Sequence, residues 1–115
     1  MSDEFIKLAT TEINDAISAL QQIMATCQTD SDISSNADEF QKHTHKIKGL
    51  APMMGKLELG NFSSTLDSIL KKMMDGVIID GIFNILNDSI FSMNRSMIES
   101  DDNLDNIKIE VDTSR

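Results

Sequence analysis

Both histidines of the chain, His43 and His45, lie in a segment without acidic residues. No Asp or Glu occurs between Gln41 and Leu57, although the formal net charge of the 115-residue chain is -9. On a helix of about 100° per residue, the stripe of residues 40, 44, 47, 51 and 54 marks the buried direction. His45 then lies about 140° from this stripe, and His43 about 60° from it. We therefore expect His45 to be exposed and reactive, and His43 to be structural.

The residues around His45 suit nucleophilic chemistry that ends with an anionic group on the ring. Gly49 and Lys48 both lie one helical turn further on. An exposed neutral imidazole is a competent nucleophile, and an ammonium group can hold the anion that it acquires. Glycine within a helix costs about 1 kcal/mol relative to alanine, so a compensating gain is expected. The glycine leaves the ring open to a bulky partner, and phosphoryl is the group that this arrangement favours. A surface histidine beside a solvated lysine is the alternative.

Asp67 is predicted to face His45 from the following helix. If a turn is centred near Lys56, His45 lies 11 residues before it and Asp67 lies 11 residues after it. The two residues then stand at similar height in an antiparallel helical hairpin. A carboxylate there can accept a proton from one imidazole nitrogen and leave the other free to attack. The alternative is an acid on the helix surface without such a role.

Four amphipathic segments must position these groups. Apolar residues recur at three- and four-residue spacing over residues 3–26 (from Ile6 onward), 36–55, 57–75 and about 79–98. Such a pattern predicts an all-α, antiparallel four-helix bundle over residues 1–99.

Three local details accompany this bundle prediction. Asn36 with Glu39 resembles a capping box that starts the second helix, and Pro52 falls in the last turn of that helix. The segment from Cys27 to Asp32 is predicted to be a polar loop. Residues 100–115 are predicted to be an irregular acidic tail, either a linker or a frayed terminus.

Composition excludes several classes of function. The acidic balance argues against nucleic acid or an anionic membrane as a partner, and no apolar run is long enough to span a bilayer. One cysteine and an N-terminus without a signal-peptide pattern suit the cytoplasm. His43 and His45 diverge by about 200°, so they do not favour a shared metal ion. The basic group Lys42, Lys46, Lys48 and Lys56 is either a solvated face or steers the chain to an acidic partner.

The run His45-Lys46-Ile47-Lys48-Gly49, followed by Ala51 and Gly55, resembles the signature H-x-[IL]-K-G-x-[AS]-x-x-x-G of histidine phosphotransfer (HPt) domains. The wider chain, over residues 3–99, is most similar to the N-terminal phosphotransfer domains of chemotaxis histidine kinases of the CheA type. Those domains carry a glutamate where this chain has Asp67, often a histidine where it has Ser64, and a small residue where it has Pro52.

The resemblance implies a phosphorelay role. His45 would accept a phosphoryl group from ATP bound to a separate kinase domain and pass it to an aspartate of a response-regulator receiver. Lys48 would contact the phosphoryl group, Gly49 would keep the site open, and Asp67 would pair with the imidazole. The domain would bind no cofactor itself, since ATP and Mg²⁺ belong to the kinase and Mg²⁺ to the receiver.

Whether the chain acts as an enzyme stays open, because nothing in it resembles an ATP site. The alternatives are a stand-alone phosphorelay protein that exchanges phosphoryl groups with receivers, and a non-catalytic helical interaction bundle. Metal binding is the weakest alternative.

Overall fold

The computed structural model describes residues 2–98, and every regular element in this range is an α-helix. The helices are α1 (Asp3–Met24), α2 (Asp30–Ser35), α3 (Ala37–Met53), α4 (Leu57–Met74) and α5 (Ile82–Ser96). The predicted all-α class is therefore confirmed. The predicted acidic tail, residues 100–115, lies outside the described residues.

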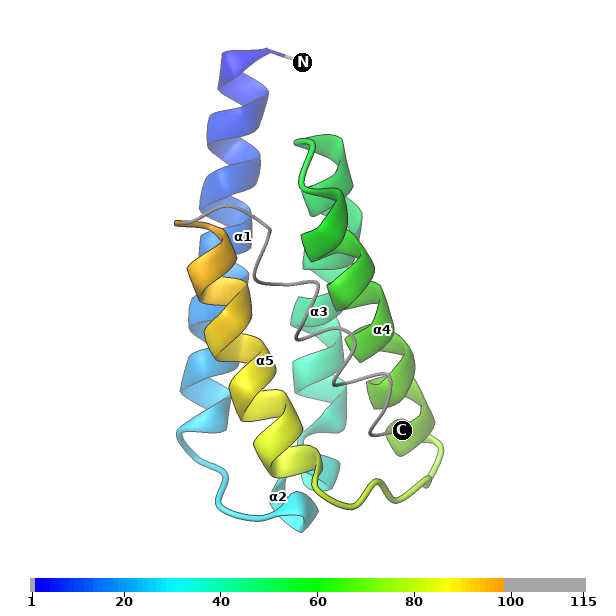
Figure 1. The fold of residues 1–115 in the computed structure, drawn as a ribbon. Coiled ribbons are helices and arrows are strands. Elements are labelled where there is room, and N and C mark those ends of the chain that lie inside the picture. The colour runs from blue at the N-terminus through cyan, green and yellow to red at the C-terminus, as the bar shows by residue number, and fades with distance from the viewer. Residues whose placement is uncertain (1, 99–115) are drawn as a thin grey trace.

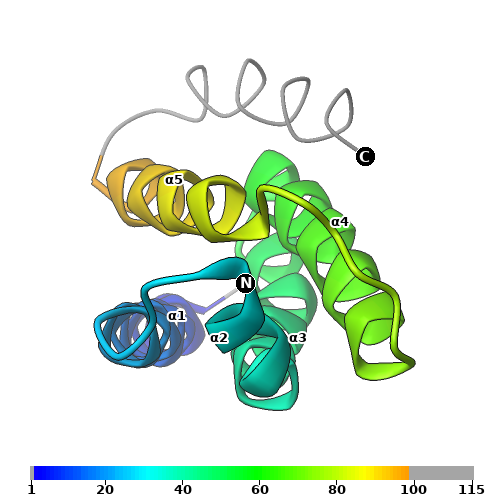
Figure 2. The same ribbon diagram turned by 90° about the horizontal axis from the view of Figure 1, so that it is seen from below.

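The four longer helices lie alongside one another, and α2 lies at one end between α1 and α3 (Figure 1). Figure 2, which looks along the helices from that end, shows α3 and α4 as neighbours, with α1 and α5 beside each other. All five helices contribute to one apolar core. Its largest fully buried side chains are Ile13, Ile17, Leu20, Ile33, Phe40, Ile47, Leu59, Phe62, Leu66, Ile69, Leu70 and Ile82.

The buried faces agree with the apolar periodicity except near the start of α1. Each large apolar side chain that leaves water contributes about 1.5–3 kcal/mol, which is why the three- and four-residue spacing fixes the inward face. Ile6 was predicted to lie on this face but is 37% exposed. The first turns of α1 extend beyond the ends of the other helices (Figure 1), so this end of α1 has fewer neighbours to pack against.

The short helix α2 corrects the prediction of a loop from Cys27 to Asp32. Thr29 caps α2, since its hydroxyl accepts the Asp32 N–H at 3.2 Å and the Asp32 carboxylate accepts the Thr29 N–H at 3.2 Å. The predicted capping box at Asn36 and Glu39 is wrong. The Asn36 amide instead donates to the Asp32 carbonyl at 2.8 Å, so it closes α2 rather than capping α3.

Asp30 joins α2 to the beginning of α5. The fourth predicted segment began near Ile79, but α5 begins at Ile82, after Gly81 with a φ of 82°. Gly81 has no side chain to cap the helix. The Asp30 carboxylate takes that role across the fold by accepting the N–H groups of Gly81 at 2.9 Å and Phe83 at 2.8 Å. These two hydrogen bonds lower the pKa of Asp30.

We expect Asp30→Ala to lower the thermal midpoint at pH 7 and to lower it much less at pH 3. Because the folded-state pKa of Asp30 is depressed, its contribution is present above about pH 3.9 and is lost as the pH falls through the folded value. Circular-dichroism melts at both pH values measure this, with the exposed Asp88→Ala as the matched control. An equal loss at pH 3 and pH 7 contradicts the capping role.

Pro52 and Gly60 bring α3 and α4 close together. Pro52 lies in the last turn of α3, as predicted, and Gly55 follows with a φ of 83° in a helix-ending turn. A Cβ atom on Gly60 of α4 would lie 2.6 Å from the Cγ atom of Pro52 and 2.8 Å from its Cδ atom. Only glycine fits at this position against the proline ring. The contact fixes how the two helices that carry His45 and Asp67 meet.

Candidate functional site

The α3–α4 hairpin brings His45, Lys48 and Asp67 together. His45 and Lys48 project from α3 toward Asp67 on α4. The Nδ1 atom of His45 lies 3.5 Å from Oδ1 of Asp67, and the Nζ atom of Lys48 lies 3.5 Å from Oδ2. One carboxylate thus faces both the imidazole and the ammonium group.

The orientation of the imidazole leaves one nitrogen for chemistry. The His45 side chain is 60% exposed, so reagents can reach it. A separation of 3.5 Å exceeds the 2.7–3.2 Å typical of an N–H···O hydrogen bond. Catalytic hydrogen bonds are often this long in a free protein and tighten when the reacting partner binds. With Nδ1 toward Asp67, Nε2 is the nitrogen that can attack.

Asp67 is a buried acid in a charged state. Its side chain is 1% exposed. Burial raises the pKa of Asp67, but the hydrogen bond from Gln41, the nearby ammonium of Lys71 and the His45 ring outweigh it, so the pKa is lowered. The Gln41 amide donates to Oδ1 at 2.7 Å, and Nζ of Lys71 lies 3.2 Å from Oδ2. Asp67 is therefore anionic near neutral pH.

The two carboxylate oxygens are compensated differently. Oδ1 accepts a short, well-aligned hydrogen bond from Gln41. Oδ2 accepts no aligned hydrogen bond, although the ammonium groups of Lys48 and Lys71 lie within 3.5 Å of it. Proximity of opposite charge, rather than directed donors, therefore compensates this oxygen.

Gln41 and Lys71 are site residues that the sequence reasoning missed. A signal for Lys71 was present, because it follows Asp67 by four residues on the same helix face. Gln41 precedes His45 by four residues on α3 and so shares its helix face. Nothing in the local sequence, however, indicates that the Gln41 amide donates across the hairpin.

Two other lysines of the basic segment, Lys42 and Lys46, are paired with acids away from Asp67. Lys42 lies 3.4 Å from Glu39 on its own helix, and Lys46 forms an ion pair with Glu12 of α1. Lys48 and Lys71, in contrast, share the single negative charge of Asp67. A surplus of positive charge thus lies next to His45 in a chain that is acidic as a whole.

Gly49 leaves open space beside the site. A Cβ atom at this position would meet no atom within 4 Å, and the residue is exposed. We therefore expect Gly49→Ala to raise the free energy of unfolding by about 1 kcal/mol, because alanine favours a helix and meets no obstacle. Urea denaturation measures the change. Gly55→Ala is the matched control and should destabilise, since the φ of Gly55 is 83°. A loss of stability in Gly49→Ala contradicts the open space.

His43 is in a different environment from His45. It is half-buried at the edge of the core. Burial lowers the pKa of His43, the positive charges of Lys42 and Lys46 lower it further, and Glu39 opposes them. The neutral ring is therefore favoured. Within residues 2–98, no group of three or more His, Cys, Asp or Glu residues is arranged to hold a metal ion.

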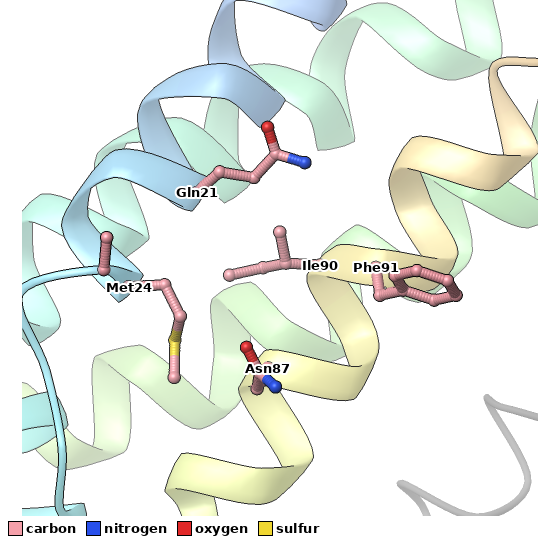
Figure 3. A pocket seen from close by; sticks show the side chains of 6 residues that line it. Gln21, Met24, Asn87, Ile90 and Phe91 are labelled. Carbon is pink, nitrogen blue, oxygen red and sulfur yellow. The ribbon is translucent and has the colours of Figure 1, made fainter.

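A shallow hollow lies between the C-terminal part of α1 and the middle of α5, with a volume of about 310 Å³ (Figure 3). It is lined by Gln21, Met24, Ala25, Asn87, Ile90 and Phe91. None of these side chains can titrate or act as a nucleophile, and none comes from α3 or α4. The candidate chemistry is therefore on the exposed face of the hairpin rather than in this hollow.

No helix among the described residues is both long and apolar enough to cross a lipid bilayer. Comparisons with protein-family models, with curated proteins and with solved structures found no match to this chain.

Proposed function

We propose that this chain is a histidine phosphotransfer domain with the four-helix bundle of that family, acting in a cytoplasmic phosphorelay. In this role, His45 accepts a phosphoryl group and passes it to an aspartate of a response-regulator receiver. One observation carries the proposal. The exposed imidazole of His45 lies 3.5 Å from a buried, anionic carboxylate that also faces Lys48. The H-x-[IL]-K-G motif around His45 supports the same conclusion.

The geometry suits each step of the transfer. Nε2 of His45 attacks phosphorus, the N–P bond forms, and the bond to the leaving group breaks. When ATP on a separate kinase domain is the donor, ADP leaves with the electron pair. The ring gains positive charge, which the Asp67 carboxylate beside Nδ1–H stabilises. Lys48 is close enough to hold the phosphoryl oxygens by charge-assisted hydrogen bonds.

Transfer to the receiver reverses the chemistry at nitrogen. A carboxylate oxygen of the receiver aspartate attacks phosphorus, the N–P bond breaks, and its electron pair returns to Nε2. The open surface at Gly49 gives a bulky partner access to the ring. Mg²⁺ belongs to the receiver, and ATP with Mg²⁺ to the kinase, so the chain itself supplies the acceptor and the groups around it.

A chemical phosphoryl donor tests the acceptor without a partner protein. Phosphoramidate transfers its phosphoryl group to an imidazole nitrogen as its own P–N bond breaks and ammonia leaves. We expect a phosphorus NMR signal that is acid-labile and alkali-stable, absent in His45→Ala and retained in His43→Ala. The half-buried His43 is thus an internal control. Labelling of both histidines at equal rates would contradict a specialised role for His45.

Isolated partner domains test the relay. The phosphorylated chain is mixed with a panel of receiver domains, and the unphosphorylated chain with histidine kinase domains and labelled ATP. Label that moves from His45 to a receiver aspartate supports the proposal. Label from ATP favours a kinase module, and label from phosphorylated receivers alone favours a stand-alone relay protein. No transfer in either direction with any partner leaves a helical interaction bundle and overturns the proposal.

A further inference from the structure

Asp67 has more positive charge beside it than its single negative charge requires. Nζ of Lys71 lies 3.2 Å from Oδ2, and Nζ of Lys48 lies 3.5 Å from the same oxygen. The other oxygen, Oδ1, already accepts a 2.7 Å hydrogen bond from Gln41. One ammonium group is therefore enough to balance the negative charge of Asp67, and the second is not needed for that purpose.

A buried carboxylate without a compensating positive charge raises the free energy of the folded chain. One of the two ammonium groups must therefore stay beside Asp67 when the other moves away. Lys71 is better placed than Lys48 to remain beside Asp67. It lies one turn beyond Asp67 on α4, so it remains next to the acid whatever happens on α3. The positive charge of Lys71 also contributes to the lowered pKa of Asp67.

Lys48 is better placed than Lys71 to move away from Asp67. It lies on α3, one turn beyond His45, and contacts Asp67 at the longer of the two distances. Its side chain is 39% exposed, so it can rotate toward a group on the ring. If Lys71 were absent, movement of Lys48 would leave Oδ2 with no ammonium group close to it among the described residues.

We propose that Lys71 is a positioning residue that holds the charge of Asp67, so that Lys48 is free to move from Asp67 to the phosphoryl group on His45. This inference rests on the proposed function, because it assumes that His45 is phosphorylated. It assigns to Lys71 no contact with the phosphoryl group. The effect of Lys71 must therefore operate through Lys48.

A double-mutant cycle tests this dependence. Initial rates of His45 labelling by phosphoramidate are measured for the parent chain, Lys48→Met, Lys71→Met and the double variant. We expect each single variant to be roughly 10-fold slower than the parent. In the Lys71→Met background, Lys48→Met should change the rate by less than about 2-fold, since Lys48 is then retained by Asp67. Independent, multiplicative effects overturn the proposal.

Two matched variants separate position from charge. Lys72→Met removes the same charge from the adjacent, exposed position and should label like the parent chain. Lys71→Arg keeps a cation beside Asp67 and should retain most of the parent rate. Loss of rate in Lys72→Met equal to that in Lys71→Met would show a general charge effect and overturn the proposal.

Lysine NMR gives a direct readout that does not need the double variant to fold. The Lys48 ammonium resonance should shift when His45 is phosphorylated in the parent chain and in Lys72→Met, but not in Lys71→Met. A shift in Lys71→Met equal to that of the parent overturns the proposal. If His45 of the parent chain is not labelled in preference to His43, the proposed function itself fails. If it is labelled but Lys71→Met behaves like the parent, only the role of Lys71 fails.

Discussion

Asp67→Asn is expected to slow the phosphorylation of His45 on the order of 10- to 100-fold while the chain stays folded. Asparagine has the shape of aspartate, and its carbonyl oxygen can still accept the amide of Gln41. It lacks the negative charge that, under the proposed function, stabilises the imidazole ring as Nε2 bonds to phosphorus. The initial labelling rate with phosphoramidate measures the loss, and circular dichroism verifies the fold.

The control for this substitution is Asp88→Asn, which changes the same net charge at an exposed position of α5. Nitrogen chemical shifts of the His45 ring provide a second readout, because Asp67 favours the tautomer with its proton on Nδ1. We expect that preference to weaken in Asp67→Asn and to persist in Asp88→Asn. A parent-like labelling rate together with an unchanged tautomer ratio would remove Asp67 from the site.

Asp67→Asn should also weaken the dependence of the free energy of unfolding on pH in the acidic range. Since the pKa of Asp67 is lowered in the folded chain, its stabilisation is present above about pH 3.9 and is lost as the pH falls through the folded value. Urea denaturation at pH 3 and at pH 6 should therefore show a smaller difference for Asp67→Asn than for the parent chain. An identical difference in both chains would mean that the Asp67 charge does not stabilise the fold.

The features that sequence reasoning predicted well depend on periodicity and on equal distance from a turn. Apolar spacing placed Phe40 and Ile47 on the inward face of α3, and both are fully buried. The count from Lys56 put Asp67 opposite His45, and these side chains lie 3.5 Å apart. Both inferences use the regular geometry of a helix, which is the same wherever the helix is in the fold.

The features that it missed depend on contacts between distant segments. Asp30 caps α5 by accepting N–H groups 51 and 53 residues further along, and Gln41 donates to a carboxylate 26 residues away. No local pattern identifies such a donor or acceptor, because many polar side chains have the same propensity. Helix α2 was missed for a related reason. Its six residues are too few for a periodic signal, and only Ile33 among them is buried.

Gly60→Ala is expected to destabilise the chain by about 1–3 kcal/mol, although alanine is the better helix former by about 1 kcal/mol. The added Cβ atom would lie 2.6 Å from Cγ and 2.8 Å from Cδ of Pro52. The proline ring is fixed to the backbone and cannot rotate away, so the two helices must separate or shift. Urea denaturation measures the loss, with Gly49→Ala as the control that should instead stabilise.

A double-mutant cycle identifies Pro52 as the source of the clash. In a Pro52→Ala background the ring is absent, so Gly60→Ala should destabilise the chain much less there than in the parent chain. Because Pro52 and Gly60 set the approach of α3 and α4, Gly60→Ala should also slow His45 labelling by displacing Asp67, and Pro52→Ala should relieve that defect. If Gly60→Ala costs the same with and without Pro52, the proline ring is not what requires a glycine on α4.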